Sequence, residues 1–234
     1  MSYEKRFDGR AFDELRPIDI KIGVIKNAKG SAMFKIGDTI AIAGVMGPKE
    51  VHPKHLRNPE KGILQVHYDM MSFSVSDRAR PGPDRRDIEL SKVIKNALEP
   101  ALILNDLPET GVYLYVYILQ ANAGTRCAAV CASSLALAHA GIPMKDLVPA
   151  VAAGKVADKI VLDLSKEEED HPEGATDMAI AMVPRGEKIT LLTMDGNISD
   201  KELRQALEYA KKGCMQIYKL QKEALRKFLK GEEK

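Results

Sequence analysis

The strongest constraint on the fold of this chain is an abrupt change of pattern around residues 120–126. Residues 112–119 are apolar, β-branched or aromatic without interruption, which is typical of a largely buried strand. Residues 126–140 are rich in alanine, which predicts a helix that packs closely on a sheet, and Gly141 ends that helix. The chain therefore contains a strand, a short loop and a helix in direct succession.

The loop between them reads QANAGTR and is a candidate anion site. The N-terminus of a helix presents unpaired N–H groups and about half a unit of positive charge. Gly124 permits close approach of the backbone, Thr125 adds a hydroxyl group, and Arg126 adds a planar guanidinium. The alternative is an ordinary turn in which Thr125 is the N-cap and Arg126 points into solvent. The loop alone does not decide between these readings.

The rest of the pattern predicts an α+β fold. Ile18, Ile20, Ile22 and Val24 alternate with other residues, which indicates a half-buried strand at the start of an antiparallel meander. The order of strands and helices, and the lack of a three-glycine fingerprint, argue against a doubly wound dinucleotide fold. Further strands are expected at residues 31–36, 39–45, 63–75, 147–156, 159–164, 178–183 and 188–194, and exposed loops at 47–62 and 165–176.

Two more helices are expected. The first begins at Arg85 and continues to about residue 102, with Pro100 bending its last turn. The second follows a capping box at residues 199–202 and ends in a frayed, Lys-rich tail.

Composition narrows the class of protein. A chain of 234 residues can bury a core without disulfides, and its three cysteines form no even, secreted-type framework. We interpret Cys127 and Cys131, four residues apart in the alanine-rich helix, as small buried hydrophobes. The sequence has no apolar run of membrane-spanning length, so we expect a cytoplasmic protein without a membrane partner.

The net charge is only +2, so the distribution of charge along the chain is more informative about binding partners than the total. Residues 76–95 hold six Arg or Lys residues against four acids, and residues 158–177 hold eight acids. Arg85 and Arg86 lie at a predicted helix start, where each opposes the helix dipole by about 0.3–1 kcal/mol. A bound anion would offset that cost. The alternative is a solvated loop in which Asp84 and Asp87 neutralise the arginines.

Several ordered motifs together resemble the RNase PH family, and most closely the catalytic RNase-PH-like subunit of the archaeal exosome. These motifs are RFDGR at 6–10, ELRP at 14–17, PDRR at 83–86, QANAGTR at 120–126, and Glu169-Asp170 followed by Asp177. The resemblance is nearly end to end. It implies one RNase PH-like domain over residues 1–234, with mixed β-sheets packed against helices in ribosomal-protein-like βαβα units. The first half, about 17–140, would hold the phosphate loop, and the second, 141–230, the acidic pair and the last helix.

The resemblance implies a phosphorolytic 3′-to-5′ exoribonuclease. Inorganic phosphate, the co-substrate, would attack the last phosphodiester of RNA and release a nucleoside diphosphate, with Mg²⁺ or Mn²⁺ as cofactor. The implied partners are RNA, a homologous non-catalytic sibling subunit in a hexameric ring, and cap proteins with RNA-binding domains. Two alternatives remain at this point: a non-catalytic ring scaffold that binds RNA, and a homohexameric, tRNA-trimming RNase PH.

The resemblance also implies residue roles. It assigns phosphate binding to Gly124, Thr125 and Arg126, RNA binding to Arg85, Arg86 and His67, and catalysis and metal binding to Asp170 and Asp177. Both phosphate and the scissile phosphodiester are anions, so N–H groups, arginines and a metal ion would be needed to bring them together. Asp170 could instead be a general acid. From composition alone, the acidic segment would be a solvated turn.

The match is imperfect at three positions. Asp170 and Asp177 are one residue further apart than the family pair, and Asn122 stands where an acid commonly precedes the phosphate loop. His67 stands where related subunits often place an arginine. A polar neighbour of RNA or a histidine on a sheet face is favoured for His67 over a metal ligand.

Overall fold

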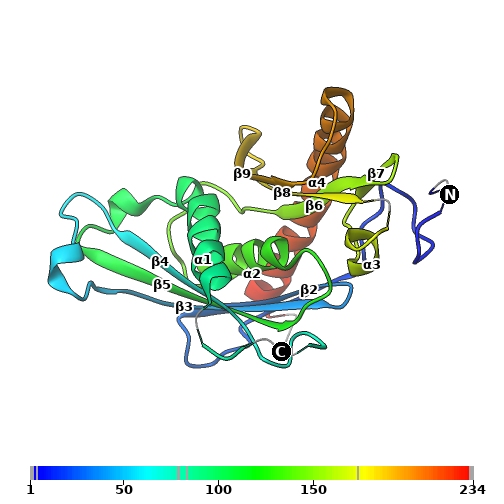
Figure 1. Cartoon of the computed structure of the whole chain (residues 1–234). Helices are drawn as coiled ribbons and strands as arrows, with labels where there is room; N and C mark the ends of the chain where they lie inside the picture. The colour runs from blue at the N-terminus through cyan, green and yellow to red at the C-terminus, as the bar shows by residue number, and fades with distance from the viewer. Residues whose placement is uncertain (1–2, 4, 78–79, 83, 173, 232–234) are drawn as a thin grey trace.

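The computed structural model describes residues 3, 5–77, 80–82, 84–172 and 174–231, which form two β-sheets and the helices packed against them (Figure 1). The first sheet has the strand order β1-β2-β3-β5-β4. Its pairs are antiparallel except β4 and β5, which run parallel. Its strands are β1 (Ile18–Ile22), β2 (Gly30–Ile36), β3 (Thr39–Glu50), β4 (Ile63–Met70) and β5 (Thr110–Gln120).

The second sheet is antiparallel throughout and has the order β7-β6-β8-β9. Its strands are β6 (Ala150–Val156), β7 (Lys159–Leu162), β8 (Ala175–Val183) and β9 (Lys188–Asp195). The helices are α1 (Arg85–Leu98), α2 (Thr125–His139), α3 (Lys166–Glu169) and α4 (Asp200–Lys230).

Helix α2 is the centre of the molecule, because it contacts strands of both sheets (Figure 1). Nearly all of its side chains are buried, and most are alanine, cysteine or serine. These small residues let the strands approach the helix axis closely. At Gly30 of β2, an added Cβ would lie only 2.3 Å from the backbone nitrogen of Ala140. The alanine-rich composition is therefore what permits one core to extend across both sheets.

The remaining helices cover one face of each sheet. Helix α1 packs on β4, so that β4, α1, β5 and α2 form a βαβα unit, and α4 packs on β6 and β7. In Figure 1, α1 and α2 lie on the same side of the five-stranded sheet. Strand β5 consequently buries alternate residues, such as Val116 and Ile118, while Tyr115 and Tyr117 are exposed on the opposite face. The expectation of a largely buried strand is thus correct for one face only.

The α+β class and the order of the expected elements are confirmed, with local corrections. The strand expected at 63–75 ends at Met70, and β3 continues to Glu50, inside the expected loop. The acidic loop contains the short helix α3. Helix α1 ends at Leu98, and Pro100 lies in a 3-10 turn, because proline cannot donate the backbone hydrogen bond that would continue an α-helix.

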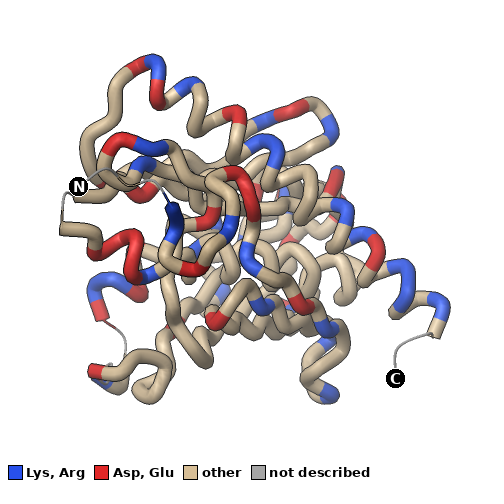
Figure 2. Tube along the Cα trace, turned by 90° about the vertical axis from the view of Figure 1, so that its right-hand side faces the viewer, with Lys and Arg blue, Asp and Glu red and all other residues tan. Residues whose placement is uncertain are grey.

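Charged residues of both signs are interspersed along the chain in Figure 2. This mixture agrees with the small net charge and means that any attraction for anions is local. Across the described part of the chain, no helix combines the length and apolar character that crossing a membrane requires.

Gly154 offers a test of the contact between β6 and β8. An added Cβ there would lie 1.8 Å from the carbonyl oxygen of Thr176, so Gly154→Ala must separate the two strands. We expect the free energy of unfolding, measured by urea denaturation, to fall by about 3 kcal/mol or more. Gly44→Ala is the control, because its Cβ would meet only side-chain atoms at 3.3 Å or more. Equal effects of the two variants would contradict this account.

Candidate active site

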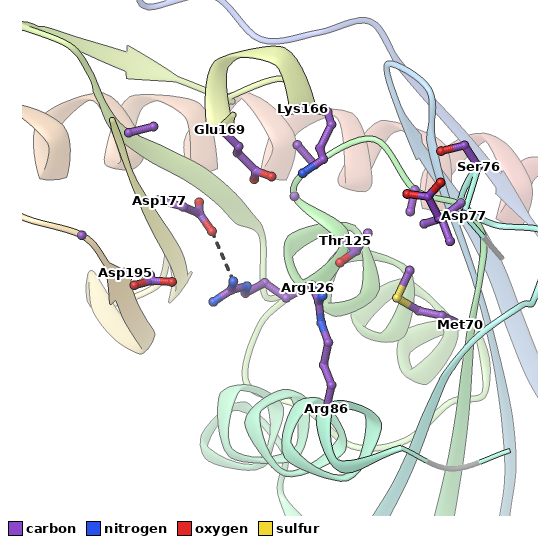
Figure 3. A pocket seen from close by; sticks show the side chains of 16 residues that line it. Met70, Ser76, Asp77, Arg86, Thr125, Arg126, Lys166, Glu169, Asp177 and Asp195 are labelled. Carbon is purple, nitrogen blue, oxygen red and sulfur yellow. Dashed lines mark hydrogen bonds and ion pairs between the residues drawn. The ribbon is translucent and has the colours of Figure 1, made fainter. Parts of the chain in front are cut away.

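A cavity of about 630 Å³ opens where the two sheets and α2 meet. Met70 at the end of β4, Gly124 at the start of α2 and Asp177 of β8 all line it. Figure 3 shows that Arg126 points towards Asp177, that Arg86 reaches up from α1 and that Glu169 and Lys166 enter from α3. The rest of the lining includes Val75, Ser76, Asp77, Ala121, Ala123, Thr125, Lys166, Ala175, Asp195 and Gly196.

The loop before α2 presents the N-terminus of that helix to the cavity. Ala123 and Gly124 both adopt left-handed conformations, with φ of 59° and 65°. Gly124 is the N-cap and Thr125 is the first helical residue, so Thr125 is not the N-cap that an ordinary turn would require. As at any helix start, the N–H groups of Thr125 and Arg126 have no acceptor within the helix. They are available to an anion in the cavity.

Hydrogen bonds from β3 and from the N-terminal segment hold this loop in place. The hydroxyl of Thr39 lies 2.9 and 2.8 Å from the carbonyl oxygens of Asn122 and Ala123, and it accepts the N–H of Asn122 at 3.0 Å. Nη1 of Arg16 donates to the carbonyl oxygen of Asn122 at 2.5 Å. The side-chain oxygen of Asn122 accepts the N–H of Lys166 at 3.1 Å. Asn122 therefore links the loop to α3, a role that an acid at this position would also permit.

Two strands of the second sheet orient the guanidinium of Arg126. Nη2 lies 3.2 Å from Oδ2 of Asp177 in β8, and Nη1 donates to the hydroxyl of Thr193 in β9 at 3.1 Å. The dashed line in Figure 3 marks the first contact. Oδ1 of Asp177 is buried without a hydrogen-bond partner among the described residues. That oxygen is free for a cation or a proton.

Acidic side chains crowd the wall opposite α2. Asp177 and Asp195 are direct partners in the β8–β9 register, a position where like charges destabilise a sheet. Burial raises the pKa of Asp177, Arg126 partly opposes this, and Asp195 adds to the rise. For Glu169, burial first and the charge of Asp177 second raise the pKa to about 7. Clustered carboxylates with raised pKa values are typical of functional sites.

The geometry of α3 determines which acid of residues 165–176 lines the cavity. Ser165 and Glu168 form a capping box at the start of α3. The carboxylate of Glu168 is buried, lies 2.7 Å from Nη2 of Arg6, and accepts a hydrogen bond from the hydroxyl of Tyr3. Successive residues of a helix point about 100° apart, so with Glu168 directed inward, Glu169 faces the cavity. Asp170 points elsewhere. Its side chain is 62% exposed and pairs with Lys166 at 2.9 Å.

The sequence-predicted residues are therefore only partly brought together. Gly124, Thr125, Arg126, Arg86 and Asp177 all line the cavity. The described lining does not include the other three expected site residues. Asp170 pairs with Lys166, Arg85 is exposed beside Asp84, and His67 stacks on Tyr115 on the far face of the sheet.

Sequence reasoning missed several lining groups. Glu169 was considered only as a neighbour of Asp170, although the pattern Ser165-x-x-Glu168 was available to predict a helical turn that turns Glu169 inward. The position of Asp195 depends on the β8–β9 register, as does that of Thr193, which contacts Arg126 but is not part of the described lining. The position of Lys166 depends on its contact with Asn122. No local sequence signal marks these three.

The cavity has few groups for a divalent cation. The described residues contain no cluster of three or more His, Cys, Asp or Glu side chains that could hold a metal ion. Glu169 and Asp177, with the unpartnered Oδ1, could supply two carboxylates. Mg²⁺ commonly binds through one or two carboxylates together with waters and substrate phosphates. The donor set thus fits a cation that is completed by substrate, and Asp170 is not part of it.

The raised pKa of Glu169 predicts a pH-dependent gain in stability for Glu169→Gln. The unfolded-state pKa is about 4.3, so the native state loses stability as the pH rises from there through about 7. In metal-free, phosphate-free buffer at pH 8, we expect the variant to be about 1 kcal/mol more stable than the parent, with the difference vanishing near pH 4. The measurement is urea denaturation across this pH range.

Asp170→Asn is the matched control. Its carboxylate is mostly exposed, so the loss of its ion pair with Lys166 should change stability by at most about 0.5 kcal/mol. A Glu169→Gln gain that is the same at pH 4 and pH 8 would show that its ionisation is not penalised in the native state.

Comparisons with known proteins identify the family of the chain. Two models of the 3′ exoribonuclease family match, domain 1 over residues 14–143 and domain 2 over residues 146–213. The exosome complex component Rrp41 of Pyrococcus furiosus is 53% identical over 227 residues, covering 97% of this chain and 90% of that protein.

Solved structures show the same fold. Rice (Oryza sativa) Rrp46 matches with a TM-score of 0.82 and 25% identity, over 93% of this chain and 98% of the other. The Archaeoglobus fulgidus exosome with RNA bound to the active site matches with a TM-score of 0.79 and 26% identity, over 92% of this chain and 91% of that one. The fold is RNase PH-like, and the chain belongs to the RNase PH, or 3′ exoribonuclease, family.

Proposed function

We propose that this protein is the catalytic subunit of an exosome ring and degrades RNA from its 3′ end by phosphorolysis. The observation that carries the proposal is one cavity in which the N-terminus of α2 and Arg126 face Glu169 and Asp177, whose pKa values are raised. An oxygen of inorganic phosphate attacks the terminal phosphodiester. The 3′ oxygen of the shortened RNA leaves and takes up a proton, and the last nucleotide departs as a nucleoside diphosphate.

The attacking phosphate binds at the start of α2. Gly124 allows its close approach, the N–H groups of Thr125 and Arg126 donate to it, and the guanidinium of Arg126 adds charge-assisted hydrogen bonds. Asp177 and Thr193 hold that guanidinium in one orientation before phosphate arrives. Such preorganised donors stabilise the charge that builds up on the transferring group.

Glu169, rather than Asp170, is the general acid in this proposal. A carboxyl group with a pKa of about 7 holds a proton at neutral pH and can donate it to the leaving 3′ oxygen. Oδ1 of Asp177, which has no hydrogen-bond partner among the described residues, can bind a cation in the cavity. Where Mg²⁺ or Mn²⁺ is bound, Asp177 would hold it together with water and substrate phosphate oxygens, which leaves Glu169 its proton, and the ion would neutralise charge on the phosphates.

Arg86 holds the 3′ end of the RNA. It lies at the start of α1 and lines the cavity beside the phosphate loop, as Figure 3 shows. Arg85 is its neighbour in sequence but lies outside the described lining. The proposal therefore gives direct RNA contact to Arg86 and assigns Arg85 a weaker, electrostatic contribution.

The proposal for the assembly rests on the names of the similar proteins. Their names describe exosome components, and one of the solved structures is an exosome with RNA in its active site. We propose that this chain alternates with a homologous, non-catalytic RNase-PH-like subunit in a cytoplasmic hexameric ring that carries RNA-binding caps. A pure scaffold has no need for an anion site that faces raised-pKa carboxylates, which favours the catalytic role. The homohexameric, tRNA-trimming form remains the second candidate.

Phosphate dependence tests the reaction. With single-stranded poly(A) RNA, the chain reconstituted with its sibling subunit should release nucleoside diphosphates only when phosphate is present. Native mass and product analysis by chromatography should be measured for the chain alone and for the reconstituted ring. Equal degradation with and without phosphate, or release of monophosphates, would exclude phosphorolysis.

A pair of variants tests the choice of acid. Glu169→Gln should lower kcat about 100-fold, because an amide cannot donate the proton, while RNA binding is retained. Asp170→Asn should stay within about twofold of the parent, because its side chain is mostly exposed and does not line the cavity. If Asp170→Asn lowers kcat as much as Glu169→Gln does, Asp170 and not Glu169 is the general acid.

A second pair of variants tests the RNA contact. Arg86→Ala should weaken RNA binding and reduce the slope of log affinity against log salt by about 0.7–1 for the lost phosphate contact. Arg85→Ala should have a smaller effect on the slope, because Arg85 does not line the cavity. Titrations at several salt concentrations without phosphate measure both. If Arg86→Ala leaves the slope unchanged, Arg86 does not contact the RNA backbone.

A further inference from the structure

A buried hydroxyl group without a hydrogen-bond partner lies close to the proposed phosphate site. Tyr68 belongs to β4 and is only 3% exposed. Its hydroxyl oxygen is buried and has no partner among the described residues. An unpaired buried hydroxyl lowers stability, and such groups are few in native proteins and call for an explanation. Tyr68 is therefore a candidate for a role in the proposed reaction.

Strand β4 directs Tyr68 to the side of the first sheet on which the cavity lies. Alternate residues of a strand point to the same face, so Tyr68 shares its face with Met70, which lines the cavity. The N–H of Tyr68 donates to the hydroxyl of Ser91 in α1 at 2.9 Å, and that hydroxyl donates to the carbonyl oxygen of Asp87 at 2.7 Å. These two hydrogen bonds tie β4 at Tyr68 to the first half of α1, the helix that also carries Arg86.

The groups around the tyrosine hydroxyl belong to the candidate active site. Burial raises the pKa of Tyr68 to about 12, while the hydroxyl of Thr125 and the charges of Arg86 and Arg126 oppose this rise. Those three residues line the cavity, whereas Tyr68 is not part of the described lining. Tyr68 thus lies behind the residues that would meet phosphate. At neutral pH it keeps its proton and is a hydrogen-bond donor.

Thr125 is the acceptor that remains for this donor. The guanidinium groups of Arg86 and Arg126 have no acceptor atom. The carboxylate of Asp87, whose charge also acts on Tyr68, is engaged in the capping box of α1. The hydroxyl of Thr125 is near enough to lower the pKa of Tyr68, although the two hydroxyl groups do not form a hydrogen bond in this structure.

A donor behind Thr125 would fix the direction of the Thr125 proton. A threonine hydroxyl has one proton and two acceptor positions, and it rotates to suit its neighbours. When a second hydroxyl donates to its oxygen, its own proton is free to point to an acceptor on the other side, and the two hydrogen bonds strengthen each other. In the cavity, that acceptor is a phosphate oxygen. Thr125 is 9% exposed, so little solvent competes for its oxygen.

We infer that Tyr68 is a positioning residue for inorganic phosphate: in the phosphate-bound protein its hydroxyl donates to Oγ1 of Thr125, so that Thr125 donates its own proton to a phosphate oxygen. The inference rests on the proposed function, because it concerns the same phosphate site. It extends that site to a residue that does not touch the substrate. Phosphate binding then pairs a hydroxyl that is otherwise buried without a partner, which adds to the affinity for phosphate.

Removal of one hydroxyl group tests the inference. Tyr68→Phe keeps the ring and loses no described hydrogen bond of the side chain, so urea denaturation should show it to be at least as stable as the parent. In the reconstituted ring with poly(A) RNA, the KM for phosphate should rise about fivefold, as expected for one hydrogen bond. The KM for RNA, and kcat at saturating phosphate, should stay within twofold. Calorimetric titration of inorganic phosphate into the ring without RNA should show the same loss of affinity.

Ser133→Ala is the matched control. Ser133 lies in the same helix as Thr125, and its hydroxyl oxygen is also buried without a partner among the described residues. It is not part of the described lining of the cavity. This variant should leave the KM for phosphate within twofold of the parent. An equal rise in both variants would show that the effect comes from packing around α2, and Tyr68 would then have no positioning role.

A double-mutant cycle tests whether Tyr68 acts through Thr125. Thr125→Val removes the hydroxyl at similar volume and should itself weaken phosphate binding. In that background, Tyr68→Phe should cause no further loss, because the group through which the tyrosine acts is already missing. A further fivefold loss would mean that Tyr68 acts on phosphate independently of Thr125, which contradicts the inference.

Failure of the inference and failure of the proposed function give different results. If the parent ring releases nucleoside diphosphates only with phosphate, and Tyr68→Phe binds phosphate as the parent does, the inference is wrong and the proposed function stands. If the parent ring shows no phosphate-dependent turnover, the proposed function fails. Calorimetry then still shows whether phosphate binds through Thr125 and Tyr68, and a parent ring that binds no phosphate would overturn the inference as well.

Discussion

The buried guanidinium of Arg16 joins the segments on which the cavity depends. Its Nε and Nη2 bind the carboxylate of Asp163 at 2.9 and 2.7 Å, and its Nη1 binds the carbonyl oxygen of Asn122. Asp163 directly follows β7, which leads into α3, and Asn122 lies in the loop before α2. One side chain thereby links the wall proposed to bind the anion to the segment that carries Glu169. The loop at Gly37 packs on the same side chain, where an added Cβ would lie 2.6 Å from Cδ of Arg16.

A second buried pair extends this arrangement. Arg6 and Glu168 are almost fully buried, and Arg6 also donates to the carbonyl oxygens of Leu162 and Asp163. Replacing a buried ion pair by apolar residues is often neutral, but removing one partner leaves an uncompensated charge at a cost of about 3–5 kcal/mol. The N-terminal segment is therefore part of the active-site scaffold, although none of its described residues lines the cavity. Its motifs RFDGR and ELRP supply both arginines.

The sequence was most informative where local chemistry decides the structure. Alternating Ile18, Ile20 and Ile22, the alanine-rich helix and the glycine before it predicted the succession of strands and helices along the chain and the loop that precedes α2. The acids were harder, because Glu169 and Asp170 are adjacent and equally acidic. Their different roles follow from a single helical turn that Arg6, more than 160 residues away in sequence, holds in place through Glu168. The pairing of Asp195 with Asp177 likewise depends on a register that no local pattern specifies.

The same long-range order explains why an unfavourable set of charges persists in the cavity. Asp177 and Asp195 oppose each other across two strands, Glu169 is half-buried near Asp177, and Oδ1 of Asp177 has no partner in the described structure. Each of these features lowers stability in the absence of ligand. Arg126 compensates only one carboxylate oxygen. Asp163 and Glu168 precede Glu169 by a few residues, and their buried pairs with Arg16 and Arg6 anchor that segment to the N-terminal part of the chain. The strain is consequently retained where a cation, a proton or a phosphate-bearing substrate can relieve it, and that relief favours binding at this cavity over the rest of the surface.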